Sequence, residues 1–183
     1  MRIISGSRRG LQLKAPKGEC TRPSEDRIKE NMFNLLGPIQ QNTRVLDCFA
    51  GSGALGLEAI SRGATYGLFF EINGKAFRVL NENIKKANFE SLCHVFCKDA
   101  LKALEKYEDE GFDYVFIDPP YSKEHLYKKV LNQIASNNLL NQDGFLMIER
   151  SEDINFDCPD YFIPVKTRKY RGTVIEIWRK REL

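Results

Sequence analysis

The sequence has no long hydrophobic run and no leader-like beginning. None of its apolar stretches approaches the roughly 18 consecutive residues of a membrane span, and the N-terminus, Met1 to Arg9, lacks the apolar stretch of a signal peptide. The five cysteines are an odd number and form no C-x-x-C pair, which argues against a disulfide framework and a zinc knuckle. We therefore expect a cytoplasmic protein with reduced thiols and no membrane partner.

Metal-ligating residues come close together in one short segment, 93–97, with the sequence CHVFC. On an extended strand Cys93 and Cys97 share one face, whereas His94 points to the other. A metal site is therefore disfavoured, and we expect no metal and two cysteines that act as small buried hydrophobes.

Internal repeats, low-complexity stretches and an obvious linker are also missing. The 183 residues fit one domain, because a second independent core normally needs about a hundred residues more. With 42% hydrophobic and 29% charged residues, the chain can bury a sizeable core. We expect a single domain over 1–183, with a basic β extension at 1–22 and the core at 23–183. No apolar stripe is left over once the expected helices are packed, so we expect a monomer.

Positive charge gathers at the two ends of the chain. The formal net charge is +3, but residues 1–22 carry +5, residues 166–181 carry +6 and residues 23–165 carry −7. Clustered positive charge suits a polyanion such as a nucleic acid, because each neutralised phosphate releases counterions. Basic ends that only aid solubility are the alternative.

Between residues 43 and 150, short β-rich runs alternate with stretches of helical spacing, which is typical of an α/β fold with a parallel sheet. Strands are expected at 43–48, 66–71, 93–97, 112–117 and 144–149. Two further runs, 161–167 and 173–179, flank the turn Tyr170-Arg171-Gly172 and predict an antiparallel hairpin. A short strand pair is expected at Arg2–Ser5 and Leu11–Lys14.

Helices are expected between these strands. One begins at Ser24 and stops at Gly37-Pro38, a second follows residue 53 as far as Arg62, and a third begins after Asn73 as its N-cap. A further helix starts near Lys123. The side chains expected to face inward are Ile28, Met32, Leu35 and Leu36, then Phe77, Leu80, Ile84 and Ala87, then Leu126, Val130, Leu131 and Ile134.

A glycine-rich loop follows the first expected strand. The pattern Gly51-x-Gly53-x-x-Gly56 permits a tight turn and a close approach of backbone N–H groups to a ligand, as in dinucleotide-binding βαβ units. Glu71, 18 residues after Gly53, stands where a carboxylate holds ribose hydroxyls. Asp47 would repel a pyrophosphate but suits a ligand with an ammonium and a sulfonium. The loop thus favours S-adenosylmethionine over NAD, with a tight turn that binds nothing as the alternative.

Asp99-Ala100 follows the third expected strand. Asp99 could accept a hydrogen bond from an adenine amino group. It could equally cap a helix, and the two roles do not exclude each other.

The tetrapeptide Asp118-Pro119-Pro120-Tyr121 stands at the end of the fourth expected strand. Prolines fix their φ angles and offer no N–H, so this turn presents only acceptors. The Asp118 carboxylate and the Pro119 carbonyl could hold both N–H bonds of an amino group on a base and favour a nitrogen whose lone pair attacks a methyl group. Tyr121 would stack on the extruded base. A rigid turn with a surface tyrosine is the alternative.

These motifs together resemble the RsmD-type family of 16S ribosomal RNA guanine-N2 methyltransferases. The resemblance also covers Arg2-Ile3-Ile4-Ser5-Gly6, Thr21-Arg22-Pro23-Ser24 and the stretch 49–59, FAGSGALGLEA. It implies a Rossmann-like methyltransferase fold, which is a doubly wound, mostly parallel seven-stranded sheet with a reversed seventh strand. It further implies catalysis at Asp118, Pro119, Pro120 and Tyr121, and S-adenosylmethionine bound by Asp47, Phe49, Ala50, Gly51, Ser52, Gly53, Glu71, Asp99, Ala100 and Asp118.

The basic ends gain a role if the substrate is 16S ribosomal RNA in the small subunit or its assembly intermediate. In such a fold the last hairpin and the start of the chain can both approach the carboxyl ends of the strands. We expect a rim that grips RNA phosphates, although Arg22 could instead lie over the cofactor. The rim residues are Arg8, Arg9, Arg22, Arg168, Lys169 and Arg171.

Three other functions stay open at this point. An adenine-N6 methyltransferase on DNA or RNA would use the same tetrapeptide, although no separate recognition domain for DNA remains. An NAD-dependent oxidoreductase is compatible with the glycine loop but disfavoured by Asp47. A non-catalytic RNA-binding module would explain the basic ends alone.

Overall fold

A seven-stranded sheet forms the centre of the molecule. The computed structural model describes residues 1–16, 23–107, 110–120, 124–170 and 172–182. The strand order is β3-β2-β1-β4-β5-β7-β6, in which the first five strands are parallel and β7 runs antiparallel to both of its neighbours. This confirms the expected α/β sheet with its C-terminal hairpin. The strands are β1 (Arg44–Asp47), β2 (Tyr66–Phe70), β3 (Cys93–Phe96), β4 (Phe112–Ile117), β5 (Leu140–Ser151), β6 (Phe162–Tyr170) and β7 (Thr173–Lys180).

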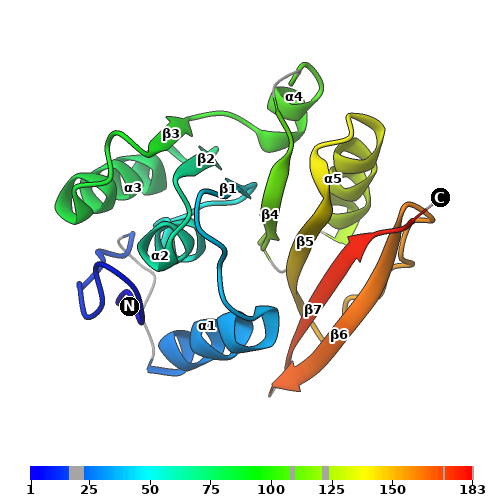
Figure 1. Ribbon diagram of the computed structural model, residues 1–183, viewed down its shortest axis with the longest axis horizontal. Coiled ribbons are helices and arrows are strands. Elements are labelled where there is room, and N and C mark those ends of the chain that lie inside the picture. Colours follow the sequence, from blue (N-terminus) through cyan, green and yellow to red (C-terminus); the bar gives the residue numbers. More distant parts are fainter. Residues whose placement is uncertain (17–22, 108–109, 121–123, 171, 183) are drawn as a thin grey trace.

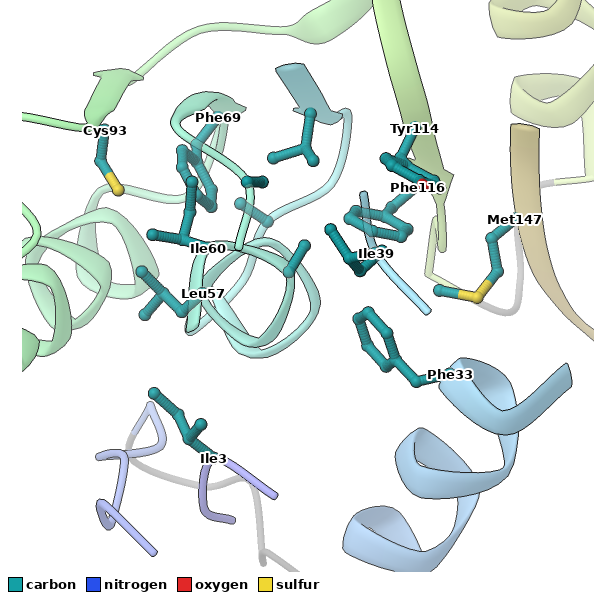
Figure 2. Close-up of a cluster of buried hydrophobic side chains, with 14 of the residues drawn as sticks. Ile3, Phe33, Ile39, Leu57, Ile60, Phe69, Cys93, Tyr114, Phe116 and Met147 are labelled. Atoms are coloured by element: carbon teal, nitrogen blue, oxygen red, sulfur yellow. The ribbon is translucent and has the colours of Figure 1, made fainter. Parts of the chain in front are cut away.

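Helices cover both faces of the sheet (Figure 1). On one face lie α1 (Pro23–Leu36), α2 (Ala54–Arg62) and α3 (Gly74–Ala87), and on the other lie α4 (Ala100–Leu104) and α5 (Glu124–Ser136). Each face therefore has its own hydrophobic cluster. In the first cluster, Phe33 of α1 approaches Phe116 of β4, with ring centroids 5.9 Å apart (Figure 2).

Local expectations for the helices are mostly met. Asn73 caps α3, because its side chain accepts from the backbone N–H groups of Lys75 and Ala76. The inward stripe of α3 includes Ala76, however, and Phe77 is only half-buried. The buried residues of α3 are thus Ala76, Leu80, Asn83, Ile84 and Ala87.

Two strand expectations need correction. β5 begins at Leu140 and not at 144, because Leu140 pairs with Phe112 across a register shift before Tyr114. Cys93 is buried as expected, whereas Cys97 is exposed, since β3 ends at Phe96 and the alternation of faces ends with it.

The first residues form an arm, Met1–Pro16, that lies along α2 and α3. The expected strand pair is reduced to one bridge, Arg2 with Gln12, flanked by hydrogen bonds such as Ile3 N to Leu11 O at 2.9 Å. The turn of the arm fits tightly, because a Cβ on Gly6 would lie 1.7 Å from the Ser61 carbonyl oxygen. Figure 2 shows Ile3 of the arm pointing toward Leu57 of α2.

A buried carboxylate fastens this arm. Glu58 of α2 is fully buried and accepts from the backbone N–H groups of Ile4 and Ser5, at 2.7 and 3.0 Å. Lys29 and Arg62 approach the same carboxylate at 3.1 and 2.8 Å. The cluster therefore fixes the arm against α1 and α2, and burial lowers the pKa of Lys29.

Within the part of the chain that the structure describes, no helix has the length and apolar character needed to cross a membrane.

A cleft at the carboxyl ends of the strands

A cleft of about 710 Å³ opens at the carboxyl ends of β1, β2 and β4. Parallel α/β sheets bind ligands at this edge, where the strand order reverses between β1 and β4. The walls come from distant parts of the chain, including Met1 and Pro16 of the arm and Met32 of α1. The predicted residues that line it are Phe49, Gly51, Glu71, Asp99, Ala100, Asp118, Pro119 and Pro120.

The glycine loop forms one side of this cleft. Gly53 has a φ of 85° and precedes α2, and its N–H donates to Ala50 O at 2.6 Å. A Cβ at Gly56 would lie 2.1 Å from the ring of Phe69, so this glycine lets α2 pack closely on β2. Gly51 has a φ of 53° and open space where its Cβ would be, so a side chain there would project into space that the loop leaves free.

Asp47 lies beneath this loop and does not line the cleft. It is 3% exposed, and its carboxylate accepts from the Gly56 N–H at 3.2 Å. Burial raises the pKa of Asp47 to about 7, the Gly56 and Phe49 amides oppose the shift, and the charge of Glu71 adds to it. Ala50, Ser52 and Gly53 lie in the same supporting layer, outside the lining of the cleft.

Glu71, at the end of β2, faces the cleft with both oxygens held in place. One oxygen accepts from the Gly51 N–H at 2.8 Å and the other from the Asn73 N–H at 2.6 Å. Each carboxylate oxygen can accept a second hydrogen bond, so Glu71 remains able to bind hydroxyl groups. Asp99 caps α4 by accepting from Leu101 N–H at 3.0 Å, and it also lines the cleft.

Asp118 follows β4 directly and lies on the floor of the cleft, followed by the buried Pro119 and the exposed Pro120. Burial raises the pKa of Asp118 well above its usual range, and the charges of Glu149 and Asp47 raise it further. Tyr121 lies outside the described residues.

Glu149 is a cleft residue that the sequence analysis missed. It belongs to β5, is 8% exposed and lines the cleft beside Asp118. The only sequence signal is an acidic residue near the end of an apolar strand, Met147-Ile148-Glu149, which carries no recognised motif. Its proximity to Asp118 depends on the pairing of β4 with β5, which local sequence does not specify.

The structure separates the expected phosphate-binding residues. Arg8 donates to Ala87 O at 2.6 Å and lies over the ring of Phe89, which places it where α3 ends, at the amino edge of the sheet. The exposed Arg9 follows in the same turn of the arm. Neither residue is therefore at the cleft, because the arm runs back toward the cleft only at its two ends.

Arg168 and Lys169 lie at the carboxyl edge instead. Arg168 pairs with Ile175 of β7, which pairs with Glu149 of β5, so these three residues form one cross-strand row. Lys169 is in the next row, toward the tip of the hairpin. Arg22 and Arg171 lie outside the described residues.

Among the described residues, no three His, Cys, Asp or Glu side chains are grouped so as to hold a metal ion.

Known proteins resemble this chain in sequence over most of its length. The family model of conserved hypothetical protein 95 matches residues 1–179. "Ribosomal RNA small subunit methyltransferase D" of Buchnera aphidicola is 37% identical over 86% of this chain and 81% of its own. The Escherichia coli protein of the same name is 34% identical over 81% of this chain and 74% of its own.

Solved structures show the same fold. An Escherichia coli structure described as "Putative methyltransferase yhhF" superposes with a TM-score of 0.88 and 27% identity, over 100% of this chain and 99% of its own. The fold is thus that of Rossmann-like methyltransferases. With its family model matched over nearly its whole length, the chain belongs to the conserved hypothetical protein 95 family, the family of RsmD-type methyltransferases.

Proposed function

We propose that this protein transfers a methyl group from S-adenosylmethionine to the exocyclic N2 amine of a guanine in 16S ribosomal RNA. The observation that carries the proposal is the position of the Asp118-Pro119-Pro120 turn. This acceptor-only turn shares one cleft with Gly51, Glu71 and Asp99. A methyl-donor site and an amine-holding site are therefore adjacent.

The residues of the cleft fit the cofactor. The free space at Gly51 leaves room for a ligand against the loop, and Glu71 and Asp99 offer acceptors for ribose hydroxyls and an adenine amine. Four carboxyl groups and three lysines line the cleft, and the excess of carboxyl groups suits a ligand that carries positive charge. When bound, S-adenosylmethionine supplies an activated methyl group on a positively charged sulfur.

Asp118 and Pro119 would act on the acceptor amine. Its lone pair is delocalised into the purine ring, so the amine is a poor nucleophile. The Asp118 carboxylate and the Pro119 carbonyl can each accept one N–H bond, which favours a tetrahedral nitrogen and aims its lone pair at the methyl donor. A proton leaves the nitrogen after transfer, and the Asp118 carboxylate or water accepts it.

Asp118 must be ionised to accept both the hydrogen bond and the proton. Its raised pKa opposes ionisation in the cleft without ligand, whereas a positive charge beside it favours the charged form. A cation bound next to Asp118 therefore favours the ionised carboxylate, which is the form that accepts the N–H bond of the base. Tyr121, which follows this turn, would stack on the base.

The relatives and the charge distribution support an RNA substrate. The curated relatives are named for ribosomal RNA of the small subunit. Arg168 and Lys169 lie at the same edge of the sheet as the cleft, where they could hold phosphates that flank the target base.

The test uses labelled S-adenosylmethionine with unmodified small-subunit particles, naked 16S RNA and DNA in parallel. We expect label in particles or 16S RNA and, after digestion, N2-methylguanosine as the product. Label that appears only in DNA, or N6-methyladenosine as the product, would contradict the proposal. Calorimetric titration with S-adenosylhomocysteine and with NAD tests the cofactor separately, and binding of NAD alone would overturn that part.

A further inference from the structure

Glu149 lies beside Asp118 because two neighbouring strands end in register. Ile117 of β4 pairs with Ile148 of β5 in parallel, so Asp118 and Glu149 are the next residues on adjacent strands. Neighbouring strands lie about 4.8 Å apart. The two carboxyl groups therefore stand next to each other at the carboxyl edge of the sheet.

The side chain of Glu149 is on the same face of the sheet as the cleft. Side chains alternate along β5, and Met147, two residues earlier, belongs to the cluster under α1. Figure 2 shows Met147 extending toward Phe33 of α1. Glu149 consequently faces the space between β5 and α1, which is the part of the cleft lined by Met32 and Lys29.

The electrostatics agree with this geometry. The charge of Glu149 contributes to the raised pKa of Asp118, which requires the two carboxyl groups to be close. A second carboxyl group at this place makes it harder to ionise the first. Two acceptors side by side match a ligand with two neighbouring donors.

Guanine and adenine differ in what stands next to their amines. The N2 amine of guanine is adjacent to N1–H, a second donor, whereas the N6 amine of adenine is adjacent to N1, an acceptor. One carboxylate can hold an amine on either base. Two adjacent acceptors fit only guanine, because the second would repel the lone pair on adenine N1.

We propose that Glu149 accepts the N1–H of the target base and thereby selects guanine over purines that lack this proton. The inference rests on the proposed function, since it concerns the base held by Asp118. Glu149 is also in register with Arg168, across Ile175, on the same face of the sheet. A base held by Asp118 and Glu149 would thus have its flanking phosphates near Arg168 in the β6–β7 hairpin.

The test compares guanine with 2-aminopurine, which keeps the amine but has a lone pair at N1. A short RNA that spans the modified nucleotide is made with either base at that position. Binding to the enzyme loaded with S-adenosylhomocysteine and methyl transfer with S-adenosylmethionine are both measured. We expect the wild-type protein to prefer the guanine RNA at least about tenfold.

Glu149→Gln should reduce that preference to within about threefold, because an amide can donate to N1 of 2-aminopurine as well as accept from N1–H of guanine. Glu149→Asp keeps a carboxylate and should retain the preference for guanine. Glu90→Gln, at an exposed site before β3, should behave as the wild type. Unchanged affinity for S-adenosylhomocysteine shows that a variant is folded.

Two results would overturn the inference. The first is a wild-type protein that binds both RNAs equally, which decides the matter even if Glu149→Gln fails to fold. The second is a folded Glu149→Gln that keeps the full preference. Product analysis of the wild type separates failure of the inference from failure of the proposed function. If N2-methylguanosine forms but Glu149→Gln keeps the full guanine preference, only the inference is rejected. If no N2-methylguanosine forms, both are rejected.

Discussion

Four acidic side chains meet at the carboxyl edge of the sheet, each near the end of a different parallel strand. Asp47 is the last residue of β1, Glu71 follows β2, Asp118 follows β4 and Glu149 belongs to β5. Burial raises the pKa values of Asp47 and Asp118, so these two groups destabilise the fold when they ionise, as is typical of a functional site. The consequence can be measured at Asp47.

Asp47→Asn should make stability less dependent on pH. The pKa of Asp47 is about 7 in the folded protein, against an ordinary value of 3.8. Because the folded value is raised, the carboxyl group lowers the free energy of unfolding progressively as the pH rises from about 4 to about 7. The asparagine variant lacks this loss, so its stability relative to the wild type should increase between pH 5 and pH 8, by about 2.5 kcal/mol.

Urea unfolding at both pH values measures this difference, with the exposed Asp153→Asn as the control. A difference between Asp47→Asn and the wild type that stays constant with pH would contradict the assigned pKa.

Sequence predicted some residues of the cleft and missed others for a physical reason. Gly51, Glu71 and Asp118 were predictable because each belongs to a local motif at the end of a strand. Asp47 was predicted to face the ligand but supports the loop from below, because the Gly56 N–H holds its carboxylate. Glu149 has no local motif, and its place depends on the register of β4 with β5.

At the scale of elements, the arm and α3 are joined by one buried side chain. Asn83 is fully buried, and its side chain bonds both the N–H and the carbonyl oxygen of Lys14, at 2.8 and 3.0 Å. The same amide donates to the carbonyl oxygen of Ser52 at 2.8 Å. Asn83 therefore links the arm to the glycine loop.

Asn83→Ala should weaken both the fold and the cofactor site. The change leaves the part-buried backbone groups of Lys14 and the buried carbonyl group of Ser52 without their Asn83 partner, which costs about 1–3 kcal/mol. We expect lower stability in urea and a several-fold weaker affinity for S-adenosylhomocysteine. Asn81→Ala, on the exposed face of the same helix, serves as the control. Lower stability with an unchanged affinity would show that the arm does not shape the cleft.

The elements themselves were predictable where periodicity is strong, as in α3 and β4. The arm was harder, because its expected strands are held mainly by contacts with Glu58, Ser61 and Asn83, which lie more than 50 residues away. The doubly wound arrangement and the reversed seventh strand followed from the family resemblance and not from periodicity, since long-range pairing leaves no local pattern.

At the scale of the whole molecule, the two groups of basic residues lie at opposite edges of the sheet. Arg168 and Lys169 are at the edge with the cleft, whereas Arg8 and Arg9 are near the end of α3. Under the proposed function, a base held in the cleft would bring its flanking phosphates to the first group, whereas the second group lies at the opposite edge of the sheet.

The double variant Arg168→Ala, Lys169→Ala should bind 16S RNA more weakly and with less dependence on salt. If each residue neutralises one phosphate, the slope of log K against log salt should flatten by about 1.4 to 1.8. Affinity for S-adenosylhomocysteine should not change. Arg9→Ala should leave the slope as in the wild type, and an equal effect of Arg9→Ala would instead assign phosphate binding to the arm.

The most direct test of the whole account is methyl transfer by Asp118→Asn. An amide at this position has roughly the shape of the carboxylate but cannot take up the proton that leaves the base nitrogen after transfer. Its NH₂ group is a donor, as is the amine of the base, so the two would not hydrogen-bond to each other. We predict that small-subunit RNA from the wild-type reaction contains N2-methylguanosine and that Asp118→Asn lowers its rate of formation at least about a hundredfold. A folded Asp118→Asn protein that forms the same product at the wild-type rate would contradict the account.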